Sequence, residues 1–303
     1  MSVVEIENVT KTFGEVKAVD ALSLTVPQGS IYGFIGPNGS GKTTTLRMIM
    51  NIFYPDSGTI RVFGQPLRRA DCERIGYLPE ERGLYKKMKV RGLLRFIGEL
   101  KSGRKVNREV DDWLERLDLG AWAGKKIETL SKGMAQKVQF ISAVVSEPEL
   151  IILDEPFTGL DPVNLEVVKN AVLDLRERGA TVIFSTHDMN VAEKMCDFIF
   201  MIFRGRKVLD ATLAAIQDEY GSDTIRLRAE GGMSRLNGLA GVEKAIDFGR
   251  FQELKMKPGT DPQRVLSDIM ARTRVHSFEA AKPTLYDIFL RIAGEGARER
   301  ADA

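Results

Sequence analysis

The 303-residue sequence has little of what marks a secreted, zinc-bound or membrane-spanning protein. Its two cysteines, Cys72 and Cys196, lie far apart, so they indicate no disulfide framework and no zinc site and fit a reducing cytosol. The opening MSVVEIENVT carries two acids and lacks the apolar segment of a signal peptide. The apolar run FIFMIF (198–203) is far shorter than the roughly 20 residues of a membrane span. A function at a membrane would therefore need a partner that spans it.

The sequence also has almost no excess of charge of one sign, because its 44 Lys and Arg residues are balanced by 42 Asp and Glu residues. The resulting net charge of +2 is too balanced to predict a nucleic-acid partner, and we expect none. A content of 43% hydrophobic residues allows a sizeable core, and the length suits one large or two modest domains.

Strand-like and helix-like segments alternate over the first two thirds of the chain, which favours an α/β fold. Continuous apolar runs such as ELIILDEP (149–156) and ATVIFST (180–186) are typical of parallel strands covered on both faces. After about residue 215, strands with one polar face and two amphipathic helices follow. The sequence predicts one domain over residues 1–215 and a small α+β domain over residues 216–303.

A glycine-rich stretch, GPNGSGKTT, matches the phosphate-binding pattern G-x-x-x-x-G-K-[ST] between a predicted strand and a predicted helix. Glycines let the backbone wrap closely and aim N–H groups at phosphate oxygens. Lys42 would place its charge on the β- and γ-phosphates, the Thr43 hydroxyl would ligate Mg²⁺, and Thr44 would add a phosphate contact. The predicted phosphate-binding residues are Gly36, Asn38, Gly39, Ser40, Gly41, Lys42, Thr43 and Thr44.

Two carboxylates, Asp154 and Glu155, end a predicted buried strand. Open α/β sheets bind their ligands at that end of the strands. Asp154 would hold Mg²⁺ directly or through water, and Glu155 would polarise the attacking water. The alternative is that both side chains only cap the next turn.

The stretch LSKGMAQKV (130–138) opens a predicted helix with a serine and a glycine and without a carboxylate. Helix N-termini attract anions, because free N–H groups and the positive end of the dipole lie there. Ser131 is either a simple N-cap or, with Gly133, part of an anion site.

These motifs, with GLDP (159–162) and STHD (185–188), stand in the order and spacing of the ATP-binding cassette (ABC) ATPases. Over residues 1 to about 215 the chain resembles that family. The resemblance implies an α/β P-loop NTPase domain of the ABC type, with a RecA-like core, an antiparallel β subdomain and a helical subdomain. It also implies ATP and Mg²⁺ as cofactors.

The family resemblance further implies a homodimer in which two nucleotide-binding domains pack head to tail. Ser131 and Gly133 of one chain would then contact the γ-phosphate that the partner binds. Asp161 resembles the residue that links the two sites across the dimer. Phe13 resembles the aromatic that stacks on adenine, with a core aromatic as the alternative. His187 resembles the switch histidine that contacts the γ-phosphate and orders the water, beside Lys42 and Glu155 as catalytic residues.

The sequence departs from the family pattern in two motifs. Glu80, in LPEERGLY, stands where the family usually has a glutamine. A carboxylate can still meet Mg²⁺, so Glu80 is a candidate nucleotide and metal contact. Lys132 and Met134 replace the usual Gly and Gln of the signature, and Lys132 points either to phosphate or to solvent. LPEERGLY and the C-terminal domain together resemble the ABC-2-type exporter subgroup, which includes sodium-extrusion and drug-efflux subunits.

The predicted function is an ATP-hydrolysing motor subunit on the cytoplasmic face of the cell membrane, where ATP-driven dimer closure acts on a separate transmembrane permease. One alternative is a soluble ABC ATPase that acts on ribosomes or DNA. Another is a regulatory cassette that binds ATP without turning it over. For the C-terminal domain, a packing and dimer-stabilising role stands against a regulatory one.

Overall fold

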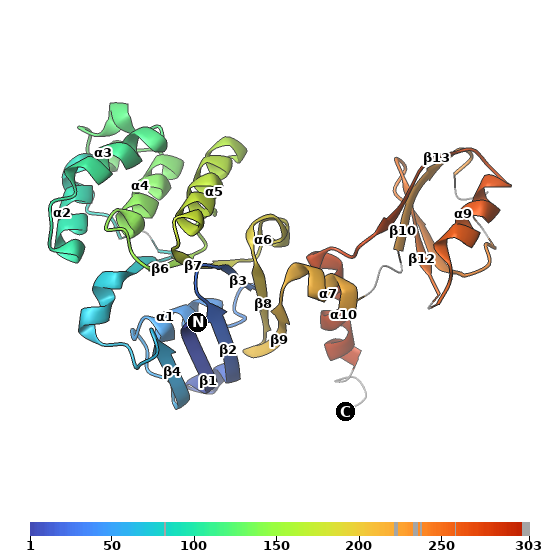
Figure 1. Cartoon of the computed structure of the whole chain (residues 1–303), viewed down its shortest axis with the longest axis horizontal. Helices are drawn as coiled ribbons and strands as arrows, with labels where there is room; N and C mark the ends of the chain where they lie inside the picture. Colours follow the sequence, from blue (N-terminus) through green and yellow to red (C-terminus); the bar gives the residue numbers. More distant parts are fainter. Residues whose placement is uncertain (82, 221–223, 233–235, 237, 258, 299–303) are drawn as a thin grey trace. The chain divides into compact units, whose positions relative to one another are not determined.

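The computed structural model divides the chain into two compact units, Met1–Thr212 and Leu213–Ala303 (Figure 1). The described residues are 1–81, 83–220, 224–232, 236, 238–257 and 259–298. Within these ranges, no helix is long and apolar enough to cross a membrane. Each unit has a hydrophobic core of its own.

A six-stranded sheet with the order β5-β6-β7-β3-β8-β9 forms the centre of the first unit. Its strands are β3 (Ile31–Ile35), β5 (Ile75–Leu78), β6 (Leu150–Asp154), β7 (Thr181–Thr186), β8 (Phe198–Phe203) and β9 (Arg206–Ala211). Neighbours from β5 to β8 pair in parallel, and β9 pairs antiparallel with β8. Every residue of β3, β6 and β7 is buried, as the continuous apolar runs predict.

Helices and a second sheet cover this central sheet. The helices are α1 (Lys42–Ile49), α2 (Val90–Ser102), α3 (Asn107–Arg116), α4 (Lys132–Val144), α5 (Pro162–Glu177) and α6 (Met189–Met195), with 3₁₀ helices at Arg69–Arg74, Gly120–Trp122 and Ile127–Thr129. The antiparallel sheet has the order β2-β1-β4 and consists of β1 (Ser2–Phe13), β2 (Val16–Pro27) and β4 (Ser57–Val62). Figure 1 shows α2 to α5 on one side of the central sheet and α1 with the antiparallel strands on the other.

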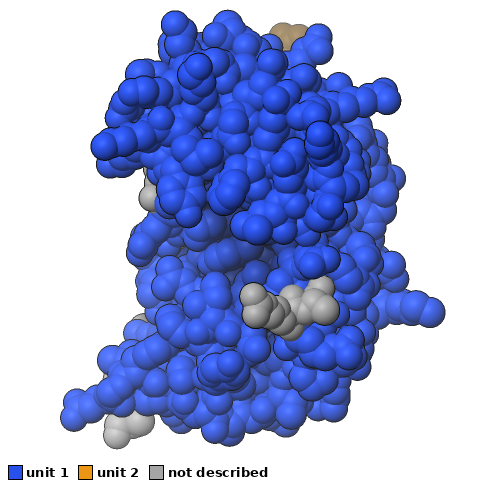
Figure 2. Space-filling model, turned by 90° about the vertical axis from the view of Figure 1, so that its left-hand side faces the viewer, with its two compact units in different colours: residues 1–212 blue, residues 213–303 orange. Residues whose placement is uncertain are grey.

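Alternate side chains of the central strands enter two different cores. On β6, Ile151 and Leu153 belong to the core under α2 to α5, whereas Leu150 and Ile152 belong to the core that includes β1, β2 and α1. Packing in both cores holds the strands in place. Open α/β sheets bind their ligands at the C-terminal ends of such strands. Figure 2 views the unit from the side of α2 and α3 and shows a recess across this face.

The second unit is an α+β structure. Its elements are α7 (Leu213–Glu219), β10 (Thr224–Ala229), β11 (Val242–Asp247), β12 (Gln252–Met256), α9 (Pro262–Met270), β13 (Val275–Ala281) and α10 (Leu285–Arg298). The strands form an antiparallel sheet with the order β11-β12-β10-β13. Because β12 and β13 both run antiparallel to β10 between them, β12, α9 and β13 form a split β-α-β unit. Its core includes Ile225, Leu254 and Ile269.

Candidate active site

The loop between β3 and α1 carries the glycine-rich motif and is held tightly by its neighbours. A Cβ atom on Gly36 would lie 2.2 Å from the Ile202 carbonyl oxygen, so no larger residue fits there. Gly41 has a φ of 110°, in the region that favours glycine. The Lys42 ammonium, at the start of α1, donates to the carbonyl oxygens of Gly36 at 2.7 Å and Pro37 at 3.1 Å. The loop therefore wraps around the lysine, as a phosphate-binding loop must.

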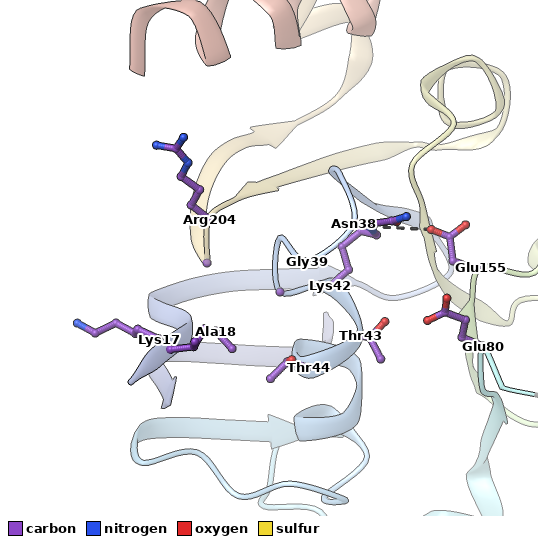
Figure 3. A pocket seen from close by; sticks show the side chains of 13 residues that line it. Lys17, Ala18, Asn38, Gly39, Lys42, Thr43, Thr44, Glu80, Glu155 and Arg204 are labelled. Carbon is purple, nitrogen blue, oxygen red and sulfur yellow. Dashed lines mark ion pairs between the residues drawn. The ribbon is translucent and has the colours of Figure 1, made fainter. Parts of the chain in front are cut away.

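A pocket of about 680 Å³ opens over this loop. Its lining residues are Val16, Lys17, Ala18, Asn38, Gly39, Gly41, Lys42, Thr43, Thr44, Glu80, Glu155, Arg204 and Gly205. Figure 3 shows Lys17 and Arg204 at one end, Glu80 and Glu155 at the other, and Lys42 between them. Cations and loop amides thus line most of the pocket, and the carboxylates gather at one end.

Asp154, the last residue of β6, lies fully buried beside this carboxylate end. Its Oδ1 accepts from the Ser185 hydroxyl at 2.5 Å and from the Thr43 hydroxyl at 3.1 Å. Its Oδ2 is buried without a hydrogen-bond partner. Burial raises the pKa of this carboxyl, and the hydrogen bonds from Ser185 and Thr43 oppose that rise.

An orphaned, buried carboxylate oxygen next to a hydroxyl fits a divalent cation. No group of three or more His, Cys, Asp or Glu side chains in the described ranges is placed to hold a metal ion. Mg²⁺ in nucleotide sites takes one or two protein ligands and completes its shell with phosphates and water. Thr43 and Asp154 therefore fit the ion, with Glu80 at the same end of the pocket.

Glu155 follows Asp154 and has a φ of 51°, a left-handed conformation that is uncommon for residues other than glycine. Its Oε1 lies 3.0 Å from Nδ1 of His187 and 3.9 Å from the Lys42 ammonium (dashed line, Figure 3). Its Oε2 accepts from the Thr158 hydroxyl at 3.1 Å. Burial lowers the pKa of Lys42, and the charges of the nearby carboxylates, Glu155 first, oppose this.

Three of the predicted residues lie at helix starts outside the pocket. Ser131 is the N-cap of α4 and accepts from the Met134 N–H at 3.3 Å. Asp161 is the N-cap of α5 and accepts from the Asn164 N–H at 2.9 Å. Gly133 has room for a side chain, because a Cβ atom there would meet nothing closer than 3.7 Å. Within one chain, Ser131 and Asp161 act as simple caps.

Five further predicted residues do not line the pocket. Asp154 and His187 adjoin its carboxylate end through Thr43 and Glu155. The other three are Phe13, Gly36 and Ser40. The Phe13 ring is 44% exposed and packs edge-on against Phe53, with ring centroids 5.4 Å apart. The Ser40 hydroxyl is buried without a hydrogen-bond partner. For Gly36, the tight approach to Ile202 explains the residue type without any ligand.

The structure adds Ser185, which sequence reasoning missed although it belongs to STHD. Its buried hydroxyl accepts from the Glu155 N–H at 2.9 Å and donates to Asp154. The register explains this, since β6 and β7 pair Asp154 with Ser185. The serine near the end of the apolar run ATVIFST could have indicated a polar contact at the end of this strand. Thr158, Lys17 and Arg204 were also missed: Thr158 and Arg204 lie in turns, and Lys17 lies near the start of β2, in the antiparallel sheet.

Ser185→Ala is expected to lower ATP hydrolysis about tenfold, because the Glu155 N–H loses its partner and Asp154 loses a donor. The free energy of unfolding should fall by about 1–2 kcal/mol. The matched control is Thr181→Val at the other end of β7, where the hydroxyl accepts from the Gly29 N–H. Thermal unfolding and steady-state hydrolysis would separate the two, and an equal rate loss in both variants would contradict the role of Ser185.

A glycine-rich loop around a lysine, with strand-end carboxylates facing it, defines a P-loop nucleoside triphosphatase. A family model described as ABC transporter matches residues 19–158, and one described as the C-terminal domain of ATP-binding proteins like DrrA1-3 matches residues 212–293. The chain belongs to the ABC transporter ATP-binding proteins.

Similar curated proteins include the ABC transporter ATP-binding protein YhaQ of Bacillus subtilis, 39% identical over 95% of this chain and 98% of that protein. The Nod factor export ATP-binding protein I of Burkholderia lata is 33% identical over 96% and 97%. The daunorubicin resistance ATP-binding protein DrrA3 of Streptomyces coeruleorubidus is 32% identical over 99% and 98%.

A solved ATP-binding subunit of an ABC transporter is 28% identical, with a TM-score of 0.68 over 73% of this chain and 94% of that chain. A nucleotide-free cassette from an ABC transporter is 26% identical, with a TM-score of 0.64 over 72% and 94%. The predicted family, fold class and ATPase activity are confirmed, and so is the likeness to drug-efflux subunits. The chain is an ATPase subunit of an ABC transporter.

Proposed function

We propose that two copies of this chain close around two Mg·ATP molecules and that this closure drives a separate transmembrane permease, in the export direction. The observation that carries the proposal is the place of the signature residues. Ser131 and Gly133 start a helix outside the chain's own pocket, and the fold has no need for glycine at Gly133. Export is supported by the DrrA-like C-terminal domain and by relatives named for Nod factor export and daunorubicin resistance.

The charge pattern of the pocket orients the nucleotide. The loop amides and Lys42 would hold the β- and γ-phosphates, with the γ-phosphate toward Glu155 and His187. Lys17 and Arg204 line the other end. They would lie nearer the α-phosphate and the ribose. Phe13, half exposed at the end of β1, would offer its ring to adenine outside the pocket proper.

Thr43, Asp154 and Glu80 would hold Mg²⁺, which neutralises charge on the phosphates when bound. Glu155 would accept a hydrogen bond from the attacking water and polarise it. His187 lies 3.0 Å from Glu155, and its ring is 53% exposed, so it can hold Glu155 in place and still reach a γ-phosphate. Lys42 stabilises the phosphate charge that grows during transfer.

Closure can favour ATP over ADP only if the closed dimer contacts the γ-phosphate. The exposed start of α4 supplies such contacts, since the free N–H groups and Gly133 would approach the partner's phosphate. Loss of the γ-phosphate removes these contacts and reopens the dimer. Asp161, at the start of α5, would connect the two sites.

The C-terminal unit is proposed as a packing and dimer-stabilising module, with a regulatory role as the alternative. Its place matches the DrrA-like domain at residues 212–293. The chain itself would sit peripherally on the cytoplasmic face of the membrane through the permease. No nucleic acid is expected as a partner, because the net charge is only +2.

A mixing experiment tests the composite site. We expect Lys42→Ala and Gly133→Asp each to lower ATP hydrolysis about tenfold, because each spoils both sites of a symmetric dimer. A mixed dimer keeps one intact site, which combines the Lys42 of the Gly133→Asp chain with the Gly133 of the other. Mixing the two inactive proteins should therefore restore up to about a quarter of the wild-type rate.

The same experiment has a clear control. Gly133→Asp should still bind ATP in its own pocket, and Gly133→Ala should fold normally because the Cβ atom has room. Full hydrolysis by Gly133→Asp would contradict the proposal that the signature completes a partner's site.

A further inference from the structure

Helix α4 carries two buried amides on one face, and each reaches a loop of the nucleotide site. Gln136 and Gln139 are 5% and 4% exposed. Nε2 of Gln136 donates to the Pro156 carbonyl at 3.2 Å, directly after Glu155. Residues three apart on a helix share a face, so both amides point toward the same region.

Gln139 binds the loop that carries Glu80 at two points. Its Nε2 donates to the Pro79 carbonyl at 3.0 Å and to the Glu81 carbonyl at 3.2 Å. Both hydrogens of the amide are used, and the two acceptors flank Glu80 in the chain. The loop backbone is thereby fixed on both sides of Glu80, whose carboxylate faces the pocket (Figure 3).

Packing alone does not account for a glutamine at this position. Its Oε1 is buried without a hydrogen-bond partner, which costs free energy that an apolar side chain of the same size would not. The hydrogen bonds from Nε2 to the Pro79 and Glu81 carbonyls therefore explain why the residue is a glutamine. The flanking residues Val138, Phe140 and Ile141 lie in the hydrophobic core.

We propose that Gln139 is a positioning residue that holds the Glu80 carboxylate at the metal end of the pocket and ties it to the helix that starts at Ser131. The inference rests on the proposed role of Glu80 as a Mg²⁺ contact. Since α4 is one continuous helix from Lys132 to Val144, a shift of its exposed start moves Gln139 as well. Gln136 links the same helix to the loop after Glu155. Contact of a partner's nucleotide with the start of α4 would thus reach both carboxylate loops of the chain's own site.

The experiment combines Gln139→Met with Glu80→Ala, which removes the side-chain oxygens, in a double-mutant cycle. Methionine keeps the size of the side chain and removes both donors. The first measurement is hydrogen exchange of the segment 79–88 in the nucleotide-free protein, which we expect to become about tenfold faster. The second is the Mg²⁺ concentration that half-saturates ATP hydrolysis, which we expect to rise about fivefold. In the Glu80→Ala background, Gln139→Met should cause no further rise.

Gln136→Met is the matched control, because it makes the same change on the same helix face but touches the other loop. It should leave the exchange of segment 79–88 and the Mg²⁺ half-saturation unchanged, whatever it does to the maximal rate. Gln139→Asn, which keeps the amide on a shorter stem, should give the same pattern in milder form if Gln139→Met folds poorly.

Suppose that Glu80→Ala alone shifts the Mg²⁺ dependence. Unchanged exchange after Gln139→Met, or an equal Mg²⁺ shift in both backgrounds, would then overturn the inference but leave the metal role of Glu80 standing. If Glu80→Ala alone leaves the Mg²⁺ dependence unchanged, the proposed metal role of Glu80 fails, and the inference fails with it. Faster exchange with a Mg²⁺ shift only when Glu80 is present supports both.

Discussion

Glu155→Gln is expected to lower ATP hydrolysis at least about 100-fold while ATP still binds and holds two copies together. Glutamine has the shape of glutamate but cannot polarise water as a carboxylate does. In the nucleotide-free protein the Glu155 carboxylate is held by Thr158, His187 and Lys42, so it is already aimed at the pocket. Loss of its charge therefore acts on the chemical step and leaves the phosphate contacts of the loop in place.

Light scattering after size exclusion, with and without Mg·ATP, measures the trapped dimer. We expect a shift from monomer to dimer only with Mg·ATP, because hydrolysis no longer removes the γ-phosphate. Glu166→Gln is a matched control, since Glu166 is an exposed residue of α5 that pairs with Lys169 and lies away from the pocket. A Glu155→Gln protein with a normal rate would remove Glu155 from the catalytic role. A monomer in both conditions would mean that closure needs the permease.

The local motifs of the site could be predicted from sequence because each is a short stretch at the end of one strand. The loop around Lys42 and the pair Asp154 and Glu155 need no knowledge of distant residues. Whether a side chain of another strand contacts these residues depends on the order of the strands in the sheet and on their pairing register. Ser185 reaches Asp154 only because β7 lies beside β6, and no local pattern gives that pairing.

The same limit applies to Gln139, which reads as one more polar residue in LSKGMAQKVQF. Its burial and its two carbonyl partners appear only once α4 is packed on the loop after β5. Phe13 illustrates the opposite case. The resemblance to the family predicts that it stacks on adenine. In the structure its ring packs against Phe53 and does not line the pocket, so its contact with adenine would form only when a nucleotide is bound.

Asp154→Asn is expected to lower ATP hydrolysis at least about 100-fold. The same substitution should make the nucleotide-free protein more stable. Asparagine keeps an oxygen that can accept from Ser185 and Thr43 but offers no charge to Mg²⁺. The wild-type carboxylate is fully buried and has one oxygen without a partner, so its charge is held at a cost to the fold. The buried carboxylate is suited to bind a cation, and without one its charge destabilises the folded protein.

The sign of the stability change follows from the raised pKa of Asp154. An acid whose pKa is higher in the folded protein than its ordinary value of 3.8 destabilises the fold when it is ionised. At neutral pH the neutral asparagine should therefore raise the free energy of unfolding and the thermal midpoint of the nucleotide-free protein. The gain should shrink as the pH falls through the raised pKa toward 3.8, because the wild-type carboxyl then becomes neutral too.

Thermal unfolding of both proteins without nucleotide, at neutral and at mildly acidic pH, measures this difference. Adding Mg·ATP should reverse the order, because the wild type gains binding free energy from the ion and Asp154→Asn does not. Asp188→Asn is the control, since Asp188 is an exposed N-cap of α6 whose carboxylate accepts from the Asn190 N–H. A nucleotide-free Asp154→Asn protein less stable than the wild type at neutral pH would contradict the argument, because it would mean that the buried charge is compensated within the fold.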